Sequence, residues 1–126
     1  MWQKMLQVGS GGGENIAPKL LWKNPSPTSA MGATTLSVDS TGYDSLMFVC
    51  AYTTTTQKKQ RTIINKSEYA QSSDWLNNIS CGGMARKITN LTDTSITVSI
   101  GTTQAGVTNT LYLPIIAIYG IKQEVV

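Results

Sequence analysis

The side chains best suited to chemistry in this sequence are clustered cations and loop aromatics. Lys58, Lys59 and Arg61 follow a run of threonines, and such a cluster can attract an acidic surface polymer. The alternative is an ordinary solvated loop tip, because physiological salt screens a few exposed charges. Tyr69 and Trp75 lie in a stretch without a clear hydrophobic period, where exposed rings can stack on sugars or anchor protein contacts. The alternative for these rings is that they cover a small satellite core.

The remaining residue types exclude most kinds of catalytic centre. The chain has no histidine, so Ser-His-Asp triads, Cys-His pairs and His-containing zinc sites are excluded. Two cysteines are too few for an all-cysteine zinc site. The seven carboxylates are scattered, whereas glycoside hydrolysis needs two that face each other. We therefore expect no catalytic residue, no metal and no cofactor, and a glycan depolymerase is kept only as a third hypothesis.

Length and charge bound the class of protein. The 126 residues suit one domain. A formal net charge of +3 is too small to predict a nucleic-acid partner. The longest apolar stretch, residues 111–121, is too short and interrupted to cross a bilayer, so no membrane insertion is expected.

Alternating apolar residues in short segments predict an all-β fold. Thr, Ile and Val are abundant, and these residues favour strands. The pattern indicates a β-sandwich or jelly-roll-like knob of about seven to eight antiparallel strands. Residues 66–83 are expected to form a long loop with a helical turn near Asp74. The expected strands are 19–23, 34–38, 43–52, 61–65, 86–91, 95–100 and 110–122.

The last of these strands carries a proline, which predicts a bulge or an edge position at Pro114. Leu111, Leu113, Ile115, Ala117 and Tyr119 are expected on one face. The other face is expected to carry Tyr112, Ile116 and Ile118.

The first thirteen residues differ in character from the rest. Residues 1–13 read as an apolar attachment peptide and a Gly-rich linker, ahead of a single β-sandwich domain at 14–126. The peptide must dock on its own domain, a symmetry mate or a neighbouring protein, and an expression scar is the alternative. Cys50 and Cys81 are expected to be thiols, because no secretory signal precedes them. The side chains expected to make the attachment are Trp2, Met5, Leu6 and Val8.

Motifs near both ends of the chain also carry a resemblance. Residues 20–30 read LLWKNPSPTSA and precede the Thr- and Leu-rich segment 34–38. Residues 39–44 hold a Gly-Tyr-Asp turn, and residues 114–122 read PIIAIYGIK. These motifs resemble small structural proteins encoded by phages and prophages of Gram-positive, often gut, bacteria. The resemblance does not extend over residues 53–83.

The resemblance implies a virion protein made in the cytoplasm of a bacterial host. The lead hypothesis is a tail-fibre or baseplate knob that binds the host surface, including its glycans, through loops. The alternative is a capsid decoration or head-fibre protein with a purely structural role. Fibre knobs are usually homotrimers, so a homotrimer is expected, bound to other phage structural proteins through its N-terminal peptide.

Overall fold

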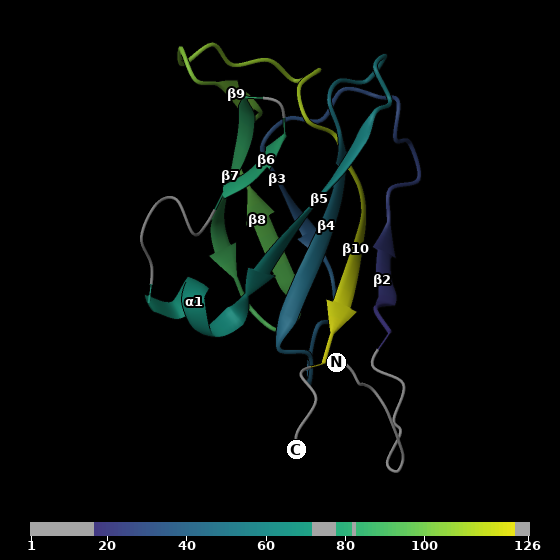
Figure 1. The fold of residues 1–126 in the computed structure, drawn as a ribbon, viewed down its shortest axis with the longest axis vertical. Helices are drawn as coiled ribbons and strands as arrows, with labels where there is room; N and C mark the ends of the chain where they lie inside the picture. Colours follow the sequence, from purple (N-terminus) through teal and green to yellow (C-terminus); the bar gives the residue numbers. More distant parts are fainter. Residues whose placement is uncertain (1–16, 72–77, 82, 123–126) are drawn as a thin grey trace, which may run out of the picture.

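The computed structural model describes residues 17–71, 78–81 and 83–122, which form two antiparallel sheets packed face to face (Figure 1). The predicted all-β, sandwich-like fold is confirmed. One sheet has four strands in the order β2 (Lys19–Lys23), β10 (Ile115–Ile121), β4 (Ser45–Ala51) and β5 (Lys59–Asn65). The other sheet has the order β3 (Thr34–Ser37), β8 (Ser95–Val98), β7 (Met84–Leu91) and β6 (Asn78–Cys81), and β9 (Thr102–Thr103) pairs with β7.

Side-chain alternation along the strands builds the core between the sheets. In β4, Leu46, Phe48 and Cys50 belong to the buried core cluster, so Met47 and Val49 lie on the opposite face. The central position expected for this strand is confirmed, because β10 and β5 flank it. Cys50 is a buried thiol, and the side chain of Cys81 lies outside the described part of the chain. The opposite sheet contributes Leu36, Ile79, Ile88, Ile96 and Val98 to the same cluster.

The closing strand differs from its expected pattern because the backbone is irregular around Pro114. The expected strand 110–122 forms regular pairs only from Ile115. Leu113 has a positive φ of 51°, and the register with β4 shifts between Ile115 and Ala117. The expectation of one continuous face is therefore wrong: Ile115 and Ile118 enter the core, whereas Ala117 and Tyr119 pair on the outer face. The bulge expected at Pro114 lies just after it.

The stretch 66–83, expected to be a long loop, contains regular structure instead. The helix α1 (Lys66–Gln71) begins directly after β5, and Asn65 donates a side-chain hydrogen bond of 2.9 Å to Glu68 at its N-terminus. Asp74, where a helical turn was expected, lies outside the described residues. Strand β6 pairs with β7 and buries Ile79. No helix among the described residues is long and apolar enough to span a membrane.

A buried arginine fixes the loops at the end of the sandwich opposite α1. Arg86 of β7 is fully buried, and its guanidinium donates hydrogen bonds to five backbone carbonyls. These carbonyls belong to three connections: β2 to β3, the segment after β8, and the segment before β10. The acceptors are the carbonyl oxygens of Met31, Gly32, Ser99, Tyr112 and Leu113.

Candidate functional site

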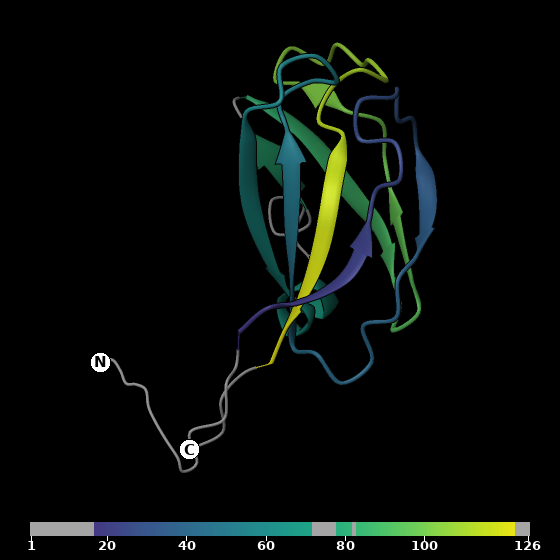
Figure 2. The same ribbon diagram turned by 90° about the vertical axis from the view of Figure 1, so that its right-hand side faces the viewer.

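The outer face of the four-stranded sheet is the surface on which strand register brings separate charges together. Figure 2 looks towards this sheet, with β5, β4, β10 and β2 side by side. One cross-strand row begins at Lys23 on β2, passes through Ala117 and Val49, and ends at Arg61 on β5. Its two cations therefore lie on opposite edge strands, about 14 Å apart at the usual strand spacing. The two side chains between them are small.

The neighbouring row on the same face is apolar. It joins Leu20, Tyr119, Met47 and Ile63 across the four strands. Leu20 is 46% exposed and Ile63 is 57% exposed, so the two ends of the row are open to a partner. Tyr119 is half-buried at its centre, and its hydroxyl makes no hydrogen bond to a described residue. The face thus places the Tyr119 ring and aliphatic side chains beside the row that carries Lys23 and Arg61 at its ends.

Charge is distributed unevenly over the molecule. The four strands of this sheet contain Lys19, Lys23, Lys59 and Arg61, and they contain no Asp or Glu. The acidic residues within the described ranges lie in loops and in α1. Between described residues, one ion pair is formed, and it joins Lys66 to Asp93. The acidic residues in question are Asp39, Asp44, Glu68 and Asp93.

The predicted cationic cluster lies at the start of β5. Lys58, Lys59 and Arg61 are all exposed. Lys59 and Arg61 belong to the strand rather than to a loop, and their partners on β4 are Ala51 and Val49. Lys58 precedes the strand, and its ammonium nitrogen lies 5.7 Å from the centre of the Tyr52 ring. Lysine on an exposed edge also discourages pairing with another sheet, so edge protection is a structural role for the same residues.

Tyr69, one of the two predicted aromatic residues, does not join this cluster. Tyr69 lies in α1, beyond the opposite end of β5, where it is half-buried and packs against the core. This packing agrees with the alternative in which the aromatic rings cover a small satellite core. Trp75 lies outside the described residues, as do Trp2, Met5, Leu6 and Val8. Sequence reasoning missed Tyr119 as a surface ring because it grouped Tyr119 with Leu113 and Ile115. These two residues lie in the core, on the other side of the bulge.

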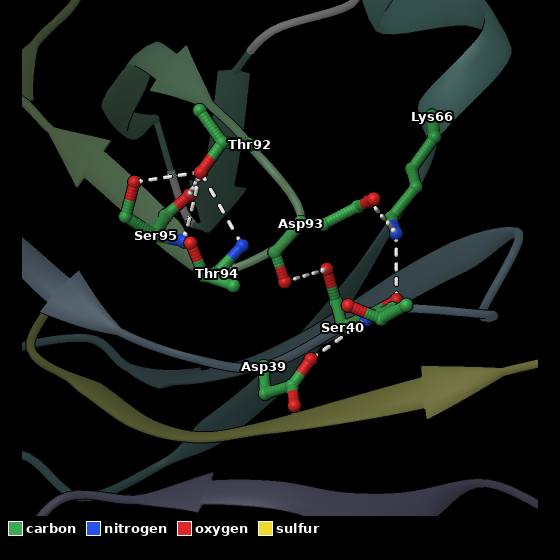
Figure 3. Close-up of polar contacts among 8 residues, drawn as sticks. Asp39, Ser40, Lys66, Thr92, Asp93, Thr94 and Ser95 are labelled. Carbon is green, nitrogen blue, oxygen red and sulfur yellow. Dashed lines mark hydrogen bonds and ion pairs between the residues drawn. The ribbon is translucent and has the colours of Figure 1, made fainter.

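A second polar cluster joins the start of α1 to two connections, β3 to β4 and β7 to β8 (Figure 3). The Lys66 ammonium lies 3.1 Å from a carboxylate oxygen of Asp93 and donates a 2.7 Å hydrogen bond to the carbonyl of Ser40. The Ser40 amide donates to the carbonyl of Asp93 at 2.7 Å. The Thr92 hydroxyl oxygen accepts the Ser95 amide at 3.0 Å and closes the turn between β7 and β8. The polar groups of this cluster bond to one another. We call the cluster a structural latch, because it joins segments that are separate in sequence.

Asp39 lies beside this latch, and its electrostatics depend on hydrogen bonds from Thr41. Its carboxylate accepts the backbone amide of Thr41 at 3.1 Å. Hydrogen bonds from the side chain and then the amide of Thr41 lower the pKa of Asp39 below 3.8, its ordinary value. A general acid at neutral pH needs a shift in the opposite direction.

Comparison of the chain with protein-family models, curated proteins and solved structures finds no match.

Proposed function

We propose that this chain is a non-enzymatic binding module: the knob of a phage tail fibre or baseplate that binds acidic polymer on a bacterial surface. The observation that carries the proposal is the exposed group of Lys58, Lys59 and Arg61 at the start of an edge strand. No described carboxylate forms an ion pair with these cations. As far as the described residues show, their charge is therefore open to an external anion. The phage setting rests on the resemblance of the terminal motifs.

The structural alternative also has support on the same face. A capsid decoration or head-fibre protein needs a surface that packs on other virion proteins. The exposed side chains of Leu20 and Ile63 offer apolar area of that kind. In both proposals the peptide with Trp2, Met5, Leu6 and Val8 attaches the chain to the virion. Tyr69 and Trp75 stay predicted ligand contacts.

The test is binding of the full chain to purified acidic wall polymer and to whole host cells. Lys58, Lys59 and Arg61 are replaced together by Gln, and the single substitution Lys87→Gln, at an exposed position of the other sheet, is compared with Arg61→Gln. We expect the affinity of the triple variant to be lower by roughly tenfold or more. Each factor of ten corresponds to about 1.4 kcal/mol of binding free energy. Arg61→Gln should weaken binding more than Lys87→Gln, and added salt should weaken the wild type most.

Two results would contradict this function. Equal binding by the wild type and the triple variant would remove these cations from the interface. Absence of cell and polymer binding by the wild type, together with loss of virion incorporation on deletion of residues 1–8, would favour the structural alternative.

A further inference from the structure

The cations at the two edges of the four-stranded sheet lie in one cross-strand row, although 38 positions of sequence separate Lys23 from Arg61. Strand register places Lys23 opposite Ala117, Ala117 opposite Val49, and Val49 opposite Arg61. The row therefore runs across all four strands, perpendicular to their direction. Lys59 lies one outward position further along β5 than Arg61 and strengthens the positive potential at that edge.

The middle of the face differs chemically from its edges. Ala117 and Val49 have short side chains between the two cations. In the next outward positions of the same strands, Tyr119 and Met47 have long side chains. An aromatic ring offers its face to the C–H groups of a sugar ring, and a tyrosine hydroxyl can hydrogen-bond a sugar hydroxyl. A ligand that lies along the row thus meets a cation at each end and Tyr119 along its side.

From this arrangement we infer that an extended acidic polysaccharide crosses the outer face from β5 to β2. Arg61 and Lys59 bind its anionic groups at one edge, Tyr119 contacts a sugar ring at the centre, and Lys23 binds a second anionic group at the far edge. Charge complementarity carries the choice of occupant, because the strands of this face hold cations and no carboxylate. The inference rests on the proposed function and names its ligand class and the path of the ligand.

Ligand length gives the sharpest test of this path. Oligogalacturonides of increasing length serve as probes, with the full chain in solution and binding measured by calorimetry. A short oligomer reaches one edge only, whereas a long oligomer spans the sheet. Lys23→Gln should therefore leave the affinity for the short oligomer within about twofold and lower the affinity for the long oligomer several-fold. Arg61→Gln should weaken both.

The central ring has its own matched pair of variants. Tyr119→Leu keeps an apolar side chain and removes the ring, and Tyr119→Phe keeps the ring. We expect the leucine variant to bind the long oligomer several-fold more weakly than the phenylalanine variant does. Linear polyphosphate, which has the charges without sugar rings, should bind both variants equally. Thermal unfolding of every variant checks that the fold is retained.

Each outcome decides the inference. If Arg61→Gln weakens binding while Lys23→Gln and Tyr119→Leu leave it unchanged at every length, the path is wrong and the proposed function stands. If polyphosphate binds as tightly as the uronic oligomers and the Tyr119 variants are equal, the occupant is a simple polyanion and the inference is wrong. If the wild type binds no acidic polymer of either kind, both the path and the proposed function fall.

Discussion

Arg86 shows how a single residue can determine the shape of one end of the sandwich. A buried arginine without a carboxylate partner is costly unless its donors are satisfied. Here the Nε–H donates to the carbonyl of Leu113 at 2.6 Å, and the terminal amino groups bind four further carbonyls. Burial lowers the pKa of the Arg86 guanidinium. The hydrogen bonds of the Arg86 side chain, rather than additional apolar packing, therefore fix these loops.

Replacement of Arg86 should therefore be among the most damaging single changes. Arg86→Met removes the donors and leaves buried carbonyls unpaired, which should lower the free energy of unfolding by about 3 kcal/mol or more. Arg86→Lys keeps a charge but lacks the planar five-donor fork, so it should fall between methionine and the wild type. Urea unfolding followed by circular dichroism measures the differences. A loss below about 1 kcal/mol for the methionine variant would show that the loops are held by other contacts.

The lowered pKa of Asp39 leads to a prediction about how the stability of the fold depends on pH. Its folded-state pKa lies below the ordinary 3.8, because the side chain and amide of Thr41 hydrogen-bond its ionised form. A carboxyl of this kind stabilises the fold above its unfolded pKa and loses that contribution as pH falls through the folded value. The urea midpoint of Asp39→Asn should therefore lie below that of the wild type at pH 7. The two midpoints should converge below pH 3.8. A difference that is constant with pH would exclude ionisation of Asp39 as its cause.

At the scale of the elements, the latch near α1 joins segments that are far apart in sequence. Lys66, the first residue of α1, contacts the connection between β3 and β4 through Ser40 and the turn after β7 through Asp93. Asp93 is the more exposed partner, with 65% of its side chain accessible against 22% for Lys66. The ion pair itself is therefore screened by solvent. The charged hydrogen bond to the Ser40 carbonyl is the stronger half of the latch.

The two halves of the latch can be separated by substitution. Asp93→Asn removes only the ion pair and should cost less than about 1 kcal/mol. Lys66→Met removes the ion pair and the hydrogen bond to Ser40, and it should cost about 1–3 kcal/mol. Chemical denaturation of both variants at low and high salt provides the measurement. Equal losses that vanish together in high salt would assign the whole effect to the ion pair.

The strands whose signal is local were predictable from the sequence. β2 has the expected bounds, Lys19–Lys23, because apolar residues are flanked by lysine and by a proline-rich turn. β6 was not predictable, because it has one buried apolar residue, Ile79, and depends on pairing with β7. Helix α1 had a local signal that was overlooked: Asn65 followed three residues later by Glu68, as in a helix N-terminus.

The candidate site was predictable in its charges and not in its geometry. Lys58, Lys59 and Arg61 lie within four consecutive positions, so the sequence alone reveals this cluster. The relation of Arg61 to Lys23 depends on the order of four strands, which no local pattern specifies. The alternation pattern places Tyr119 on one face with Ile115, whereas one extra residue between Ile115 and Ala117 puts them on opposite faces.

At the scale of the whole molecule, cations lie on the strands, whereas the described carboxylates lie outside them. The outer face of the four-stranded sheet carries cations, and the described carboxylates lie in α1 and the loops. An anionic surface would attract this face. Because the net charge is only +3, the steering is local and weak at physiological salt. In the proposed function, a single chain should therefore bind an acidic polymer only weakly.

The predicted homotrimer would compensate for weak single sites in the proposed surface binding. Three linked sites can raise apparent affinity for a polymer-coated surface by about 10²–10⁴ over one site. Light scattering of the full chain should give about three times 13.6 kDa at micromolar concentration, and a monomer there would contradict the trimer. Tyr119→Arg tests whether subunit contacts use the centre of the sheet face: a trimer that persists shows that its contacts do not require Tyr119. A trimer that dissociates would place subunit contacts on the face, and the polymer could not cross it.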